Sequence, residues 1–102
     1  MTKPGNVIRF TTTPEGADEF ANILGRAIEH VRAERGATTW MASRSEDDPT
    51  CFFIVDLFVD EEARAAHFEG RAAALILGEG GPLLAAQPDI STVRLVTAKD
   101  AR

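Results

Sequence analysis

The chain has 102 residues, enough for one domain and too few for two, because a chain of this size buries only about 60 to 65% of its unfolded surface. Hydrophobic residues make up 44% and charged residues 26%, which is typical of a globular domain and unlike a disordered segment or a coiled coil. The 11 basic and 16 acidic side chains give a net charge of −5, which argues against nucleic acid or an anionic membrane surface as a partner.

Cysteine content and hydropathy bear on the cellular compartment, on metal sites and on membrane spans. Cys51 is the only cysteine, so an internal disulfide or a cysteine-based metal site cannot form, and we expect a reducing cytoplasm and no metal. The longest apolar run, Ala72 to Leu77, is far shorter than the roughly 20 residues of a membrane-spanning helix. The sequence does not start with a basic segment followed by an apolar one, so we expect that the protein is not exported.

The chain begins with a predicted strand. Met1 to Asn6 is polar and contains Pro4-Gly5, so we expect a loose lead-in. Val7 to Thr12 is β-branched and aromatic, as strands favour, and Pro14 to Gly16 ends it.

An amphipathic helix follows. From Ala17 to Arg35, apolar side chains recur at the spacing of one helix face, and Gly36 ends the pattern. Its start is open between two positions: Thr13 could cap the helix, or the helix could begin just after Gly16.

The middle of the chain predicts a hairpin. Thr38 to Arg44 and Cys51 to Val59 have strand composition, and the polar turn Ser45 to Pro49 joins them. The segment Cys51 to Val59 is apolar at every position except Asp56. Since strand side chains alternate between faces, both faces of this strand should be hidden from water.

The last third predicts further helices and a final strand. Asp60 should cap a helix that runs to about Gly70, with acidic residues in its first turn. The remaining segments are a short helix at Arg71 to Leu77, a flexible turn or lid at Gly78 to Pro82, another possible turn of helix at Leu83 to Ala86 and a strand at Ser91 to Ala98.

The element order β-α-β-β-α-β predicts a single α+β domain with its core at about 7–99. We expect a four-stranded antiparallel sheet with strands one and three central and the helices on one face. Phe53, Val55 and Leu57 would then lie on the uncovered face, which is costly in water. A second copy of the sheet is the simplest cover, so we expect a homodimer.

One motif resembles a known family. The residues Phe53-x-Val55-Asp56-x-Phe58-x-Asp60-Glu61-x-Ala63-x-x-x-His67, with Gln87 to Ile90 before the last strand, are similar to the antibiotic biosynthesis monooxygenase superfamily over most of the chain, from Val7 to Lys99. The resemblance implies a ferredoxin-like protomer and a dimeric α+β barrel. Family members include cofactor-free monooxygenases that oxidise phenols or quinols with O₂, haem-degrading relatives and proteins without assigned activity.

His67 is the first candidate for catalysis. On the inner face of its helix it could act as a general base that takes a phenolic proton, because imidazole titrates near neutral pH. The competing interpretation is structural: a half-buried histidine that holds the helix to the third strand or to Asp56. Histidines on apolar faces are more often structural, so this second interpretation carries about twice the weight.

Aromatic residues suggest a pocket for a flat ring. Trp40, Met41, Phe53 and Phe58 could line it between the helices and the sheet, although Phe53 suits the core or the dimer interface better. Phe58 stands where many relatives have Trp, and the chain contains no Tyr. The missing phenol donors weaken the monooxygenase interpretation.

Polar candidates also have competing interpretations. Arg9 and Arg64 could hold a phenolate oxygen, or Arg9 could pair across the sheet while Arg64 faces solvent. Asp56 needs a partner within its apolar strand. Asn6 and Asn22 are the only candidates for a catalytic amide, and neither is favoured.

The leading hypothesis is therefore a monooxygenase without a cofactor that oxidises a small aromatic phenol, anthrone or quinol, with His67 as base and Trp40, Phe58, Arg9 and Arg64 around the substrate. A non-catalytic module that binds a small hydrophobic ligand is the main alternative. Haem degradation is a third and weaker one, because the stretch that would supply the histidine ligand, Ala72 to Leu77, is wholly apolar.

Overall fold

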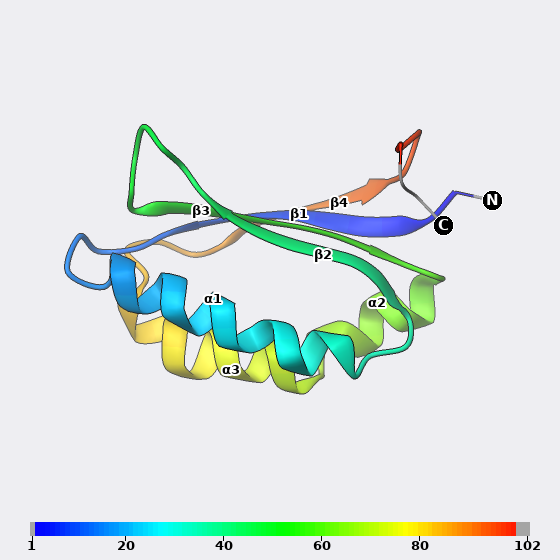
Figure 1. Cartoon of the computed structure of the whole chain (residues 1–102), viewed down its shortest axis with the longest axis horizontal. Helices are drawn as coiled ribbons and strands as arrows, with labels where there is room; N and C mark the ends of the chain where they lie inside the picture. The colour runs from blue at the N-terminus through cyan, green and yellow to red at the C-terminus, as the bar shows by residue number, and fades with distance from the viewer. Residues whose placement is uncertain (1, 100–102) are drawn as a thin grey trace.

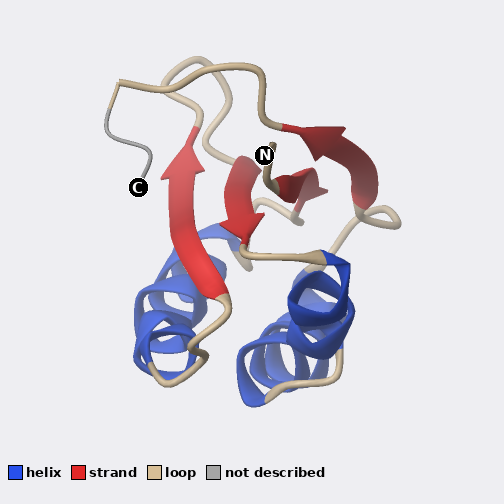
Figure 2. Ribbon diagram, turned by 90° about the vertical axis from the view of Figure 1, so that its right-hand side faces the viewer, coloured by secondary structure: helices blue, strands red, loops and turns tan. Residues whose placement is uncertain are grey.

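The computed structural model describes residues 2–99 and confirms the expected α+β architecture. The elements are β1 (Pro4–Thr11), α1 (Ala17–Arg32), β2 (Ala37–Arg44), β3 (Cys51–Phe58), α2 (Glu61–Phe68), α3 (Arg71–Gly80), the 3₁₀ helix η1 (Gly81–Leu83) and β4 (Asp89–Arg94). The strands form one antiparallel sheet in the order β2-β3-β1-β4, and the helices cover one of its faces (Figures 1 and 2). Strands β1 and β3 are central, as the sequence predicts.

The core lies between the helix layer and the sheet. The apolar stripe of α1, from Ala17 to Val31, is buried against the sheet and α3. Phe20 is fully buried, with its ring centroid 5.2 Å from that of Phe10 on β1 and 5.1 Å from that of Phe52 on β3. These contacts fix the helix layer over the central strands.

The start of β1 differs from the expectation. Pro4 to Asn6 is not a loose lead-in but part of β1, with Gly5 opposite Leu57 and Asn6 opposite Asp56. Asn6 donates both its backbone and its side-chain N–H to the Asp56 carboxylate, so a polar residue extends the strand instead of ending it. Composition alone does not show such a pairing across the sheet.

The segment between α3 and β4 also differs. Gly78 to Gly80 is the last turn of α3 and continues directly into η1, so it is neither a turn nor a lid. Helix α3 continues through these glycines because Gly80 lies against the Phe20 ring, where a side chain would not fit. Strand β4 begins earlier and ends earlier than expected, since Arg94 lies opposite Pro4 and β1 offers no strand beyond that point.

The two faces of β3 have different environments. Phe52, Ile54 and Phe58 face the helices and are buried. Phe53 and Val55 point to the other face and are only half-buried, and Met41 on the same face is 55% exposed. No helix among residues 2–99 is long and apolar enough to cross a membrane.

Candidate functional site

A polar row crosses the sheet on its helix-covered face. Strand pairing places Trp40, Asp56, Asn6 and Thr92 side by side on β2, β3, β1 and β4. The row lies two residues along the strands from the core row of Ile54. Side chains two residues apart on a strand point to the same face, so this row faces the helices too. Asn6 and Asp56 are both fully buried. A carboxylate in this position is unusual and needs partners that hold it.

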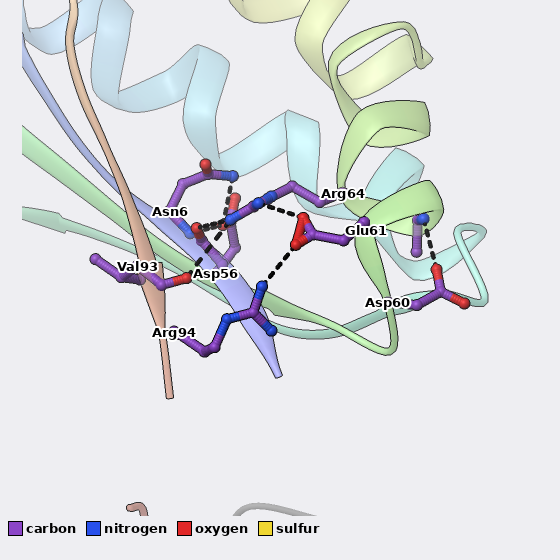
Figure 3. Close-up of polar contacts among 9 residues, drawn as sticks. Asn6, Asp56, Asp60, Glu61, Arg64, Val93 and Arg94 are labelled. Atoms are coloured by element: carbon purple, nitrogen blue, oxygen red, sulfur yellow. Dashed lines mark hydrogen bonds and ion pairs between the residues drawn. The ribbon is translucent and has the colours of Figure 1, made fainter. Parts of the chain in front are cut away.

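Asn6 supplies partners for one oxygen of Asp56. The Asn6 backbone N–H donates to Oδ1 at 2.9 Å, and its side-chain amide donates to the same atom at 3.0 Å (Figure 3). Burial raises the pKa of Asp56, although the hydrogen bonds from Asn6 and the nearby His67 and Arg64 act in the opposite direction. Asp56 is therefore a carboxyl group that holds a proton more readily than an exposed one.

His67 lies above this carboxyl group on α2. Asp60 caps α2 by accepting the Ala63 N–H at 2.8 Å. The His67 ring is 5% exposed and sits between two carboxyl groups: Nδ1 is 2.6 Å from Glu34 Oε1, and Nε2 is 3.7 Å from Asp56 Oδ2. The first distance is a hydrogen bond and the second is too long for one.

His67 also borders two hollows. One is an apolar cavity of about 70 Å³ between the sheet, α2 and α3, in which His67 is the single titratable group. Its wall consists of Ile8, Phe10, Ile54, His67, Phe68, Ala73, Ile76, Leu77, Pro88 and Ile90. The other hollow, of about 180 Å³, lies beside the end of α1 and includes Glu34 and Arg35. His67 is thus a shared wall between an apolar chamber and a polar surface hollow.

Four buried side-chain atoms of residues 2–99 have no hydrogen-bond partner: Asn6 Oδ1, Glu34 Oε2, Trp40 Nε1 and Asp56 Oδ2. Three of these residues belong to the polar row and the fourth, Glu34, contacts His67. Buried polar groups are rarely left unpaired in proteins, and a catalytic role or a bound water accounts for many of the exceptions. Within the same part of the chain, no three His, Cys, Asp or Glu side chains are grouped so as to hold a metal ion.

Arg64 lies at one end of the sheet and is hydrogen-bonded to two of its strands. Its side chain reaches from α2 toward β1 and β4 and donates to the Gly5 carbonyl at 3.0 Å and to the Val93 carbonyl at 3.5 Å (Figure 3). It also pairs with Glu61, which binds Arg94 at 2.7 Å. Arg64 is therefore tied to the sheet, and does not face solvent as one interpretation of the sequence had it.

Of the other predicted residues, the structure brings Phe58 against His67 but leaves Trp40 and Arg9 elsewhere. Trp40 lines a separate open groove of about 330 Å³ between α1 and β2, together with Leu24 and Phe52. Phe58 is fully buried, with its ring 5.1 Å from that of His67, and borders neither hollow beside His67.

Arg9, Met41 and Phe53 lie on the uncovered face of the sheet. Arg9 is opposite Phe53 on the neighbouring strand, and its guanidinium is 3.9 Å from the Asp89 carboxylate, with both side chains exposed. Met41 is opposite Val55 and Phe53 is its neighbour on the same face. The expected common pocket of aromatic residues and Arg9 is therefore wrong, because strand alternation sends these side chains to opposite faces.

Two residues of the site carried no clear signal in the sequence. Asn6 falls in a segment whose Pro-Gly pair predicts a loop, although an asparagine directly before a strand is a weak sign of a polar strand end. Glu34 follows α1 in a charged stretch typical of solvated helix ends. Only the tertiary structure, which places the segment between α1 and β2 against α2, brings it to His67.

Comparison with known proteins identifies the family. A model of the antibiotic biosynthesis monooxygenase family matches residues 5–74. Among solved structures, a protein of unknown function from Nitrosomonas europaea has a TM-score of 0.88 and 34% identity, covering 97% of this chain and 94% of that one. No curated protein gives a match.

Two more distant structures carry the family name. A putative antibiotic biosynthesis monooxygenase from Caulobacter crescentus is 22% identical with a TM-score of 0.85, over 94% of this chain and 92% of that one. Another from Nitrosomonas europaea is 16% identical with a TM-score of 0.86, over 92% and 90%. Because the family model covers more than half of the residues and the fold agrees, the chain belongs to the antibiotic biosynthesis monooxygenase family.

Proposed function

We propose that this protein is a monooxygenase that uses no cofactor and oxidises a small aromatic phenol, anthrone or quinol with O₂. The observation that carries the proposal is His67, which forms part of the wall of an apolar cavity and whose Nε2 is 3.7 Å from the buried Asp56 carboxyl group. A base in such a place can remove a proton from a ring hydroxyl while the apolar wall holds the ring.

The reaction needs little beyond this arrangement. Loss of the hydroxyl proton gives an electron-rich phenolate, which can reduce O₂ directly. One oxygen atom enters the ring and the other leaves as water, so that a phenol and O₂ give a quinone and water with all atoms balanced. His67 or Asp56 takes the first proton and returns it when the oxygen–oxygen bond breaks. The protein supplies the base and an apolar chamber that keeps bulk water away.

Cavity size favours a single ring. The enclosed volume of about 70 Å³ is below the 150 Å³ or so that encloses a benzene molecule in an engineered cavity. Phe68, Leu77 and Ile90 stand at its rim and are 41 to 55% exposed. A one-ring phenol or quinol would therefore enter only when these rim side chains move outward, and the outer rings of an anthrone would rest on them.

Oxygen uptake tests the proposal. Purified protein without added flavin or metal is supplied with monocyclic phenols, hydroquinones and anthrones in an oxygen electrode, and His67→Gln is compared with His30→Gln. His30 is the only other histidine and lies on α1 away from the cavity. We expect uptake by the protein and by His30→Gln, and a loss of about 10²- to 10⁴-fold in His67→Gln. Full turnover by His67→Gln would remove His67 from the reaction.

A non-catalytic module that binds a small hydrophobic ligand is the second candidate. The cavity wall contains no hydroxyl or amide group, and no Tyr is present to donate a hydrogen bond to an oxygen intermediate. Calorimetric binding of the same compounds without any oxygen uptake would select this function.

We also propose that the protein is a homodimer whose subunits pack through the uncovered face of the sheet. Phe53, Val55 and Met41 form an apolar surface there that no helix among residues 2–99 covers. The twofold pairing of two such faces would remove this surface from water. Sedimentation at low micromolar concentration should show a particle of about twice 11.0 kDa; an 11.0 kDa particle would refute it.

A further inference from the structure

The two oxygens of Asp56 have different surroundings. Oδ1 accepts two hydrogen bonds from Asn6, whereas Oδ2 is buried without a partner. Because Asn6 holds one oxygen from two directions, the carboxyl group cannot rotate to share its partners. Oδ2 is left facing the His67 Nε2 atom at 3.7 Å.

Glu34 fixes the other side of the His67 ring. Where the Glu34 carboxylate is the acceptor in the 2.6 Å contact, Nδ1 is the protonated nitrogen of His67. Nε2 is then the nitrogen that faces Asp56. Gly70 permits this approach, because a β-carbon at that position would lie 3.2 Å from Glu34 Oε2.

These two atoms are complementary to one hydroxyl group. When Nε2 and Oδ2 share a single proton, they present one donor and one acceptor, and a hydroxyl group is likewise one donor and one acceptor. An oxygen atom about 2.8 Å from each of them would make two hydrogen bonds of ordinary length, since the atoms are 3.7 Å apart. A ketone could pair with only one of the two atoms, and an unsubstituted ring would pair with neither.

The apolar cavity lies beside this pair, with His67 in its wall and Asp56 one row further along the sheet. Ile8 and Ile54 line the cavity, and they lie two residues from Asn6 and Asp56 on the same strands and the same face. The polar row is therefore the next row of the sheet, and His67 borders the cavity above it. A ring placed against Ile8 and Ile54 would direct a substituent toward Asp56.

We propose that His67 Nε2 and Asp56 Oδ2 form a receptor for one hydroxyl group on an aromatic ring in the apolar cavity, and that Glu34 is the positioning residue that turns Nε2 toward it. The inference rests on the proposed function and deepens it, because it names the substituent that the site selects. It also assigns roles to Asp56 and Glu34.

Binding of a matched pair of compounds tests the receptor. Affinities for p-cresol and toluene, which differ in one hydroxyl group, are measured by calorimetry under anaerobic conditions. We expect p-cresol to bind about tenfold or more tightly, since hydrogen bonds to charged groups carry that much discrimination. Asp56→Ala, which removes Oδ2 and leaves Nε2 alone, should abolish the preference, and Asp89→Ala on the opposite face should retain it. Equal affinity of the unmodified protein for both compounds would overturn the proposal.

Nitrogen-15 NMR tests the role of Glu34 even if Asp56→Ala does not fold. We expect the protein to carry His67 in the Nδ1–H tautomer, with Glu34→Ala changing it to Nε2–H and losing the preference for p-cresol. Glu34→Gln, whose amide oxygen can still accept, should restore both. A ring protonated on Nε2 but not on Nδ1 in the unmodified protein, or an unchanged tautomer in Glu34→Ala, would refute the assignment.

The two hypotheses fail separately. Selective binding of p-cresol without oxygen uptake on any compound would refute the proposed function and leave the receptor standing. Oxygen uptake with equal binding of p-cresol and toluene would refute the receptor alone.

Discussion

The contact between α1 and α3 makes a sharp prediction about two glycines of one helix. Gly78 and Gly80 both lie in the last turn of α3, yet a β-carbon at Gly78 would meet nothing within 4 Å. At Gly80 it would lie 2.8 Å from Cε1 and 3.1 Å from Cδ1 of Phe20. The Phe20 ring cannot retreat, because it is fully buried between Phe10 and Phe52.

Gly78→Ala should stabilise the protein and Gly80→Ala should destabilise it relative to Gly78→Ala. Replacing glycine by alanine inside a helix gains up to about 1 kcal/mol, and the end of a helix gains less. Overpacking of a fixed core costs about 1 to 3 kcal/mol, so the free energies of unfolding of the two variants should differ by about that amount. For a domain of this size, each kcal/mol corresponds to about 4 to 8 °C in the melting temperature.

Thermal and urea unfolding followed by circular dichroism measure this difference directly. Because both substitutions are identical and stand in the same helical turn, helix propensity nearly cancels between them. Equal melting temperatures for Gly78→Ala and Gly80→Ala would show that α3 does not rest on Phe20 as described. The described placement of α3 above the cavity would then be contradicted as well.

Three further predictions concern the charged group, the uncovered sheet face and the aromatic core. Because burial raises the pKa of Asp56, the folded state binds a proton more tightly than the unfolded state does. The free energy of unfolding should therefore fall as pH rises above the ordinary pKa of about 3.8. Asp56→Asn should flatten this pH dependence in urea titrations, and an unchanged slope would contradict the burial effect. Met41→Glu should convert the proposed dimer to an 11.0 kDa particle in sedimentation. Leu77→Glu, on α3 and also 55% exposed, should leave the dimer intact. A dimeric Met41→Glu variant would argue against the uncovered sheet face as the interface. Phe58→Ala should lower the free energy of unfolding by about 3 to 5 kcal/mol, and Arg9→Ala by at most about 1, as measured in urea; similar losses would mean that Phe58 is not core.

The succession and type of the elements followed from the sequence. Apolar spacing gave the helix that ends before Gly36, and the apolar run around Asp56 gave a central strand, because side-chain periodicity of 3.6 or 2 is a local property. The fold class and family followed from the same local features together with the motif that ends at His67. Boundaries near Asn6 and Gly80 were missed, since a partner across the sheet or the helix layer determines each of them.

The tertiary structure decided which residues come together at the site. His67 and Asp56 could be picked out from the sequence because a histidine on an apolar helix face and an acid in an apolar strand are both unusual there. Their partners Asn6 and Glu34 are 50 and 33 residues away in the chain, and only strand register and helix packing bring them together. The same register separates Arg9 from His67, because neighbouring residues of a strand point to opposite faces.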